Sequence, residues 1–248
     1  MKKKYKIGFQ GELGAYSHIA ALKLFPKAEI KACKTFDETF RLAAEDDNFS
    51  IIIPIENSLA GRVADIHYLL QKYKLQIHSE FFLEVEHNLL ACKGASIEKI
   101  KKVRSHGQAI SQCQKIIQKY NFEPIIAADT AGSAKYLSSN KDRTEGAIAS
   151  KLSAKIYGLQ VLKQNIEDES GNVTRFLVMA KEKIQPDYKS GKKYITSCIF
   201  RLKSIPSALY KCLGGFATNQ INLTKLESFS VKNSFEQVNF YLDFEGHL

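Results

Sequence analysis

Short runs of β-branched residues alternate with segments of helical periodicity from Lys4 to about Lys181. Such alternation is typical of βα units packed on parallel or mixed sheets. The alternation occurs in two series, one before and one after a long alternating segment, Gln76–Cys92. The sequence therefore predicts an α/β fold with two lobes, whose chain crosses between them near 76–92 and 165–181. A cleft between two such lobes is a common place for a small-molecule site.

The elements of each lobe follow from the same pattern. In the first lobe we expect a strand at 5–9, a helix at 18–25 with Ser17 as its N-cap, a helix opened by Thr35, a doubly buried strand at 50–55 and a helix near 63–72. In the second we expect strands at 102–105, 124–127 and 146–149, and helices at 108–120 and 130–137. A strand at 173–181 closes the region.

A different order of elements follows a predicted linker at 182–193, which contains Pro186 and Gly191. From 194 to 248 we expect a strand at 195–202, a helix at 207–217 and strands at 223–231 and 235–244, the last two joined by a turn at Asn233-Ser234. This is a ferredoxin-like α+β module without its second helix and last strand. Either the chain is cut short or a partner completes the edge, and dimerisation is the favoured remedy.

Composition excludes several classes of protein. No apolar run approaches the roughly 18 residues that span a bilayer, and the lysine-rich start has no signal-type core. The five cysteines contain no Cys-x-x-Cys pair, so we expect reduced thiols, no membrane partner and a cytoplasmic location. The net charge is +10, but only six of the 36 basic residues are arginine and the lysines are dispersed. We therefore expect no nucleic-acid partner, and a positive field that steers small anions.

Three predicted βα junctions carry small hydroxyl or amide residues where helices begin: Gly14–Ser17, Glu56–Gly61 and Asp129–Ser133. Helix N-termini offer unpaired N–H groups, so these junctions, which include Ser17 and Thr130, can hold carboxylates. Ordinary helix capping is the alternative interpretation of each junction taken alone.

Glu56-Asn57-Ser58 directly follows the apolar run Ile51–Ile55, at the strand end where open α/β sheets bind ligands. Glu56 is either a general acid, if water is excluded from it, or a hydrogen-bond acceptor behind the residues that touch the ligand. Both hypotheses stay open on sequence grounds.

Asn172-Val173-Thr174-Arg175-Phe176 enters another apolar strand. Arg175 is either a surface residue or a bidentate clamp for a carboxylate. Strand alternation directs Thr174 and Arg175 to opposite faces. If both serve one ligand, the backbone must be irregular here or Arg175 must act from the rim.

The six histidines show no metal-ligand spacing, and there is no P-loop, dinucleotide fingerprint or nucleophile elbow. We therefore expect no metal and no cofactor, which leaves cofactor-free chemistry on an anionic small molecule.

Five ordered motifs together resemble the prephenate dehydratase family over nearly the whole chain: Gly11–Ala21, Pro54–Gly61, Ser105–Ala109, Asp129–Ala134 and Asn172–Phe176. The resemblance implies a two-lobed fold like that of type 2 periplasmic binding proteins in a catalytic domain at 1–181. It also implies conversion of prephenate to phenylpyruvate, water and carbon dioxide in phenylalanine biosynthesis. The implied catalytic residues are Thr174, Glu56 and Arg175, and the implied substrate-binding residues are Ser17, Asn57, Ser58, Gln108, Thr130 and Phe176. With no chorismate mutase helices before the first strand, the resemblance predicts a monofunctional enzyme.

The region 194–248 resembles the ACT module, which senses phenylalanine in this family. The resemblance implies a regulatory ligand site made by Ala208, Leu209, Asn222, Leu223, Glu227 and Ser228, and a homodimer or homotetramer. Phe229-Ser230 stands where the family has Arg-Pro, and Ser207 where it has glycine, so inhibition by phenylalanine is an open question. Gly107 replaces a proline but leaves Gln108 in place.

Two alternative functions remain open. Arogenate differs from prephenate only by an amino group on its side chain, and no residue of the sequence separates an arogenate dehydratase from a prephenate dehydratase. A non-catalytic sensor with a similar cleft is the alternative from another class, and the Thr174-Arg175-Phe176 motif favours the enzyme.

Overall fold

The computed structural model describes residues 5–62, 66–184, 186–230 and 238–247 of the 248-residue chain. The chain divides into two units. The first unit contains Met1–Asp65 and Tyr73–Glu182, and the second contains Ile66–Lys72 and Lys183–Leu248.

The first unit contains a six-stranded mixed sheet in the order β2-β1-β3-β11-β5, with β4 paired to β3. Its strands are β1 (Lys6–Gln10), β2 (Glu29–Cys33), β3 (Phe49–Asn57), β4 (Gly61–Arg62), β5 (Gln76–Glu84) and β11 (Val173–Ala180). β1 is parallel to β2 and to β3, whereas β11 is antiparallel to both β3 and β5. Helices α1 (Tyr16–Leu24) and α2 (Phe36–Glu45) pack against this sheet.

The isoleucine run explains the central position of β3 in this sheet. Ile51, Ile52, Ile53 and Ile55 are all 0% exposed, so side chains on both faces of the strand are buried. β-branched residues suit such a doubly covered strand. The prediction of a strand buried on both faces is confirmed, and the strand runs on to Asn57.

The first unit also contains a five-stranded mixed sheet in the order β10-β6-β9-β7-β8. Its strands are β6 (Asn88–Ala91), β7 (Lys102–His106), β8 (Glu123–Ala127), β9 (Glu145–Ala149) and β10 (Gln160–Lys163). The helices around it are η1 (Ile97–Lys99), α4 (Gly107–Ser111), α5 (Gln114–Tyr120), α6 (Thr130–Asn140) and α7 (Lys151–Tyr157). The predicted α/β class with mixed sheets is confirmed.

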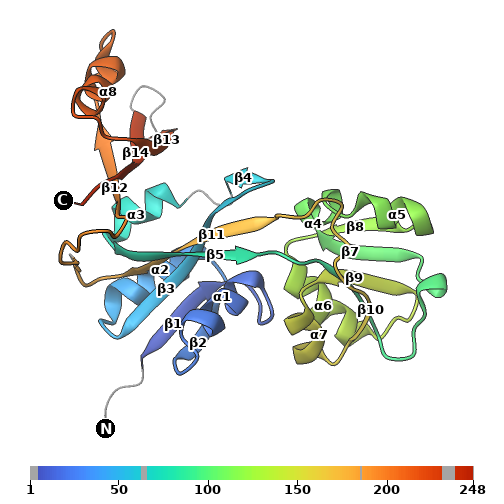
Figure 1. Ribbon diagram of the computed structural model, residues 1–248. Coiled ribbons are helices and arrows are strands. Elements are labelled where there is room, and N and C mark those ends of the chain that lie inside the picture. The colour runs from blue at the N-terminus through green and yellow to red at the C-terminus, as the bar shows by residue number, and fades with distance from the viewer. Residues whose placement is uncertain (1–4, 63–65, 185, 231–237, 248) are drawn as a thin grey trace. The chain divides into compact units, whose positions relative to one another are not determined.

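Helices cover both faces of this second sheet (Figure 1). Leu89 and Ala91 of β6 share a core cluster with residues of α4 and α5, whereas Leu90 shares another with residues of α6 and α7. Because successive strand residues point to opposite faces, these two clusters lie on the two sides of the sheet.

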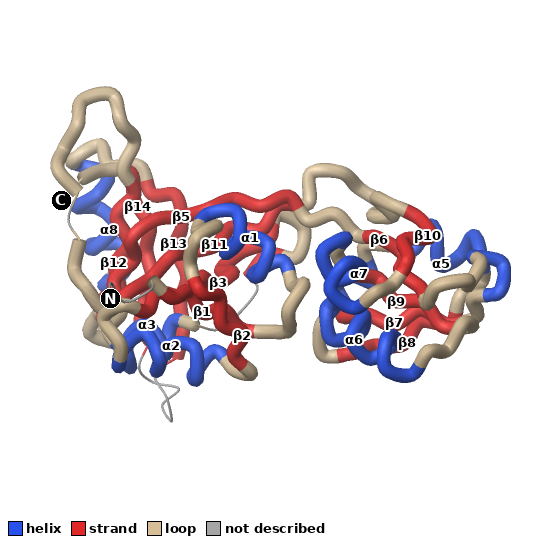
Figure 2. Tube along the Cα trace, turned by 90° about the horizontal axis from the view of Figure 1, so that it is seen from below, coloured by secondary structure: helices blue, strands red, loops and turns tan. Residues whose placement is uncertain are grey.

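The chain passes between the two sheets twice, from β5 to β6 and from β10 to β11 (Figures 1 and 2). The two crossing segments are hydrogen-bonded to each other: Val85 N donates to Asn172 O at 2.7 Å, and Ile166 N donates to His87 O at 2.9 Å. Residues on either side of these bonds are therefore held close together although they are about 80 positions apart.

Several predicted boundaries were wrong. Ser17 is not an N-cap, because α1 begins at Tyr16 with Ala15 as its N-cap. The predicted helix at 108–120 is two helices, α4 and α5, and 76–92 is two strands. Helix α7 and strand β10 were not predicted. The predicted cap at Thr35 is confirmed, since its side chain accepts a hydrogen bond from Glu38 N at 3.1 Å.

The second unit contains an antiparallel sheet in the order β12-β14-β13. Its elements are β12 (Ile195–Arg201), α8 (Ala208–Thr218), β13 (Leu223–Ser230) and β14 (Val238–Glu245), together with Ile66–Lys72, which includes most of α3 (His67–Tyr73). His67 is 0% exposed and its ring lies 5.0 Å from that of Phe229 and 4.7 Å from that of Tyr241, measured between centroids. The predicted turn at Asn233-Ser234 lies outside the described residues, as do residues 63–65 of the predicted third helix.

Candidate functional site

Asn57 and Thr174 form the centre of the candidate site. Asn57 is the last residue of β3, and its partner across the strand pair is Thr174, the second residue of β11. The Asn57 Nδ2 atom donates to Thr174 Oγ1 at 3.0 Å and to Asn172 Oδ1 at 2.6 Å. Asn57 and Thr174 are only 8% and 7% exposed. The structure therefore joins an amide and a hydroxyl from two predicted motifs in one buried pair.

The Thr174 hydroxyl has its proton available for a ligand. Its Oγ1 atom accepts the bond from Asn57, and within the described part of the chain it donates to no other protein atom. A hydroxyl carries one proton and can accept and donate at once. An incoming oxygen or carboxylate can therefore accept a hydrogen bond from the Thr174 hydroxyl.

Ser58 braces the turn that precedes β11. Its Oγ atom donates to Gly171 O at 2.9 Å and accepts from Val173 N at 2.9 Å, and its own N donates to Val173 O at 2.8 Å. Since its single hydroxyl proton is used in this contact, Ser58 holds the two motifs together in this structure.

Glu56 and Arg175 are paired in register on β3 and β11, one position before Asn57 and one after Thr174. The register of this strand pair shifts between Arg175 and Phe176, which marks a β-bulge. The Arg175 Nε atom also lies 2.8 Å from Glu80 Oε2. Arg175 therefore carries a carboxylate partner on β5, and alternation directs it and Glu56 away from the Asn57–Thr174 face.

The remaining predicted site residues lie in different surroundings. Phe176 is 1% exposed and packs within the core of the first sheet. Ser17 is buried in the first turn of α1, and Thr130 begins α6 after the N-cap Asp129. Gln108 is exposed near the start of α4, and its N donates to His106 Nδ1 at 3.2 Å. Among the described residues, no hydrogen bond joins Ser17, Gln108 or Thr130 directly to Asn57 or Thr174.

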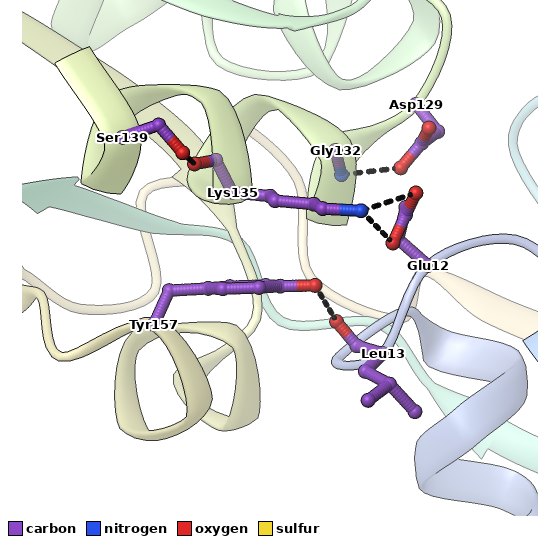
Figure 3. A network of polar contacts seen from close by, with 7 residues as sticks. All are labelled: Glu12, Leu13, Asp129, Gly132, Lys135, Ser139 and Tyr157. Atoms are coloured by element: carbon purple, nitrogen blue, oxygen red, sulfur yellow. Dashed lines mark hydrogen bonds and ion pairs between the residues drawn. The ribbon is translucent and has the colours of Figure 1, made fainter.

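The loop that precedes α1 contacts helices α6 and α7 (Figure 3). Lys135 of α6 pairs through Nζ with both carboxylate oxygens of Glu12, at 3.0 and 2.9 Å, and the Tyr157 hydroxyl donates to Leu13 O at 2.9 Å. Ser150 Oγ donates to Gly14 O at 2.6 Å. The loop after β1 is thus fastened to helices of the second sheet.

A chain of side chains that the sequence patterns did not indicate leads away from the central pair. Asn172 Nδ2 donates to Gln112 Oε1 at 2.9 Å, and His87 Nε2 lies 3.0 Å from the same oxygen. The Tyr16 hydroxyl lies 3.0 Å from His87 Nδ1 and donates to Glu86 O at 2.7 Å. Burial lowers the pKa of His87 and raises the pKa of Tyr16 well above its ordinary value.

The described residues contain no cluster of three or more His, Cys, Asp or Glu side chains that could hold a metal ion. None of the described helices is long and apolar enough to cross a membrane.

The chain is thus an α/β protein with two mixed sheets, and a buried hydroxyl–amide pair lies beside the segments that cross between them. The chain belongs to the prephenate dehydratase family, since the family model described as prephenate dehydratase matches residues 7–184. The bifunctional N-acyl-homoserine lactone acylase/prephenate dehydratase of Komagataeibacter europaeus is 37% identical over 97% of this chain and 85% of that protein. Arogenate dehydratase 2 of Petunia hybrida is 39% identical over 99% of this chain, which spans 65% of the petunia protein.

Solved structures give the same family. The prephenate dehydratase of Arthrobacter aurescens, solved in complex with L-Phe, superposes with a TM-score of 0.87 at 26% identity, covering 98% of this chain and 80% of that one. The prephenate dehydratase of Staphylococcus aureus superposes with a TM-score of 0.80 at 27% identity, covering 98% and 90%.

Proposed function

We propose that this protein is a prephenate dehydratase that converts prephenate to phenylpyruvate, water and carbon dioxide. The observation that carries the proposal is the Asn57–Thr174 pair, because it leaves the Thr174 proton free to meet a leaving hydroxyl. The reaction needs no cofactor, since the electrons of the breaking bond to carbon dioxide complete an aromatic ring as the hydroxyl departs.

Thr174 assists the departure of the ring hydroxyl. As the carbon–oxygen bond breaks, negative charge develops on that oxygen, and a positioned O–H donor stabilises it. A threonine hydroxyl is too weak an acid to surrender its proton near neutral pH, so the proton that completes the water molecule comes ultimately from elsewhere. One proton is consumed, and prephenate gives phenylpyruvate, carbon dioxide and water.

Arg175 is the proposed carboxylate clamp, acting from the rim beside the bulge at Arg175–Phe176. Glu56, in register with it, is assigned the role of hydrogen-bond acceptor for neighbouring groups, and bulk water is the proton source. Asn57, Gln108, Ser17 and Thr130 complete the proposed binding surface, with helix N–H groups for the carboxylates. Ser58 contributes by bracing Asn57 against β11.

We assign this chemistry to a catalytic domain at 1–181 with the fold of type 2 periplasmic binding proteins. Both sheets support that assignment, because each contains a strand with two parallel neighbours, β1 in the first sheet and β7 in the second, and an antiparallel strand beside them: β11 in the first sheet and β6 in the second. A linker at 182–193 leads to an ACT-like module, 194–248, in a cytoplasmic homodimer or homotetramer.

Phenylalanine is the proposed effector of that module. A hollow of about 210 Å³ in the second unit is lined by residues that include Ala208 and Leu209. One carboxylate oxygen of Glu227 lies 2.9 Å from Lys225 Nζ, and the other lies 3.3 Å from His67 Nε2. These contacts hold Glu227 in place next to Ser228. Asn222 and Leu223, at the start of β13, complete the proposed site.

The test is to incubate the purified protein with prephenate and with arogenate separately and to identify the products. Phenylpyruvate from prephenate supports the proposal. Phenylalanine formed from arogenate at the higher kcat/KM would make the protein an arogenate dehydratase, a name that several relatives carry. Binding of either compound without turnover would identify a sensor.

A further inference from the structure

The orientation of the Asn57 amide is fixed by the backbone. Its Oδ1 atom accepts hydrogen bonds from Leu59 N at 3.1 Å and Ala60 N at 2.9 Å. Backbone N–H groups only donate, so the oxygen must face them and the Nδ2 atom must face Thr174 and Asn172.

This orientation sets the direction of every following bond. Since Asn57 Nδ2 donates, Asn172 must present its oxygen to Asn57 and its amide nitrogen to Gln112. Gln112 must then present its oxygen, and the same oxygen faces His87 Nε2. His87 therefore carries its proton on Nε2, and Gln112 Oε1 is the acceptor for two converging donors. The other ring nitrogen of His87, Nδ1, shares the Tyr16 hydroxyl proton with a backbone carbonyl.

Both donors to Gln112 Oε1 come from buried residues, and Gln112 itself is half-buried. Asn172 is 1% exposed and His87 is 3% exposed. In such surroundings hydrogen bonds are stronger than in water and an unmatched donor is costly. A change of the Gln112 side chain therefore alters the hydrogen bonding of Asn172 and, through Asn172, the position of the Asn57–Thr174 pair.

Gln112 also fixes the helix that carries Gln108. Gln112 is the C-cap of α4, and its N donates to Gln108 O at 3.0 Å. Its carbonyl oxygen accepts from Asp168 N of the second crossing segment at 2.7 Å, and the Asp168 carboxylate caps α5 through Gln114 N at 2.7 Å. One residue thus contacts the Gln108 helix, the crossing segment and the side chains that lead to Thr174.

We propose that Gln112 is a positioning residue for the dehydration, which holds Thr174 and Gln108 in register through Asn172 and α4. The inference rests on the proposed function and adds to it a residue outside the binding surface. Gln112 makes no contact with the substrate. It acts by keeping the Thr174 hydroxyl aligned with the carbon–oxygen bond that breaks when the ring hydroxyl leaves.

The experiment compares Gln112→Met, which has similar length but no strong acceptor, with Gln112→Glu, whose carboxylate oxygens can accept both donors. The matched control is Gln114→Met, because among the described residues the Gln114 side chain donates to Ile110 O of α4, at 2.8 Å, and bonds neither Asn172 nor His87. Both kcat and KM are measured with prephenate at a temperature where circular dichroism shows each variant folded.

We expect Gln112→Met to lower kcat by about ten- to a hundredfold, as a small misplacement of a reacting group does, with KM changed less than about threefold. Gln112→Glu and Gln114→Met should retain kcat within about threefold of the wild type. If Gln112→Met does not fold, Gln112→Asn, which keeps the amide but not its reach, should show the same fall in kcat.

Two results would overturn the inference while the proposed function stands: an unchanged kcat in Gln112→Met, or equal losses in the Met and Glu variants. A purely structural role would lower the unfolding temperature of Gln112→Met without altering kcat. A wild-type protein that turns over neither prephenate nor arogenate would instead refute the proposed function, and the inference with it.

Discussion

The Nδ2 atom of Asn57 lies 3.0 Å from the Oγ1 atom of Thr174, although the two residues are 117 positions apart in the sequence. The strands that carry them, β3 and β11, are adjacent and antiparallel. Because the amide donates, the hydroxyl oxygen accepts and its proton is directed elsewhere. The chemistry proposed here depends on that direction.

Asn57→Asp should reverse the direction of the hydrogen bond to Thr174, and it also removes the donor to Asn172 Oδ1. A carboxylate still accepts from Leu59 N and Ala60 N, but it cannot donate to Thr174, whose proton it captures. We expect kcat to fall roughly a hundredfold, comparable to the loss of one transition-state donor. Steady-state kinetics with prephenate measure the effect. Asn140→Asp, the same change at an exposed helix end, serves as the control, and an equal loss there would contradict the argument.

Gly14→Ala should destabilise the loop after β1. Gly14 has φ +94°, and an added Cβ would lie 2.8 Å from Ser153 Cα. Gly158 also has positive φ, at +67°, but an added Cβ there has no atom within 4 Å. We expect Gly158→Ala to lower the free energy of unfolding by about 1–2 kcal/mol. Gly14→Ala should add a further ~1–3 kcal/mol for overpacking. Urea unfolding measures the loss of stability in each variant. Equal losses would show that the loop after β1 shifts to accommodate the added methyl group without cost.

The stability of the fold should decline as the pH falls below the ordinary pKa of histidine. Burial lowers the pKa of both His87 and His18. Between an unfolded value of about 6.5 and the lower folded values, the unfolded chain binds more protons, so the free energy of unfolding falls with decreasing pH. Each histidine contributes its full stabilisation above about pH 6.5, and this stabilisation is lost as the pH falls towards the pKa of that histidine in the folded protein.

His87→Gln isolates one part of that dependence, since an amide can donate to Gln112 without titrating. Urea unfolding at about pH 7.5 and pH 5 should show a smaller difference for His87→Gln than for the wild type. The half-buried Asp46 and the exposed Asp142, whose pKa values are lowered by hydrogen bonds to backbone N–H groups, titrate below this range. If the free energy of unfolding changes equally between the two pH values in His87→Gln and in the wild type, His87 does not contribute to the pH dependence.

Local patterns predicted the parts of the structure that depend on local interactions. The isoleucine run gave a doubly buried strand, and Thr35 caps α2 because its partner, Glu38, is only three residues away. The predicted N-cap at Ser17 was wrong because α1 begins two residues earlier than predicted, at Tyr16, and Gly14 N before it donates to His18 Nδ1 at 3.0 Å.

Contacts from distant segments explain most of what the patterns missed. The helical periodicity of 108–120 gives no sign of the break at Gln112, because the group that caps α5 is Asp168, from the second crossing segment. Likewise, Gln112 and His87 join the Thr174 region through bonds spanning 60 and 25 positions. Neither spacing leaves a periodic signal, so only the folded chain reveals these residues.

The most direct measurement of the central claim is the kcat of Thr174→Val beside that of Thr174→Ser, with prephenate as substrate. Valine keeps the shape of threonine but removes its proton, whereas serine keeps the hydroxyl. We expect kcat to fall about 10²- to 10³-fold for valine, the usual effect of removing one such donor, and much less for serine. A valine variant with turnover close to that of the wild type would contradict the role proposed for Thr174.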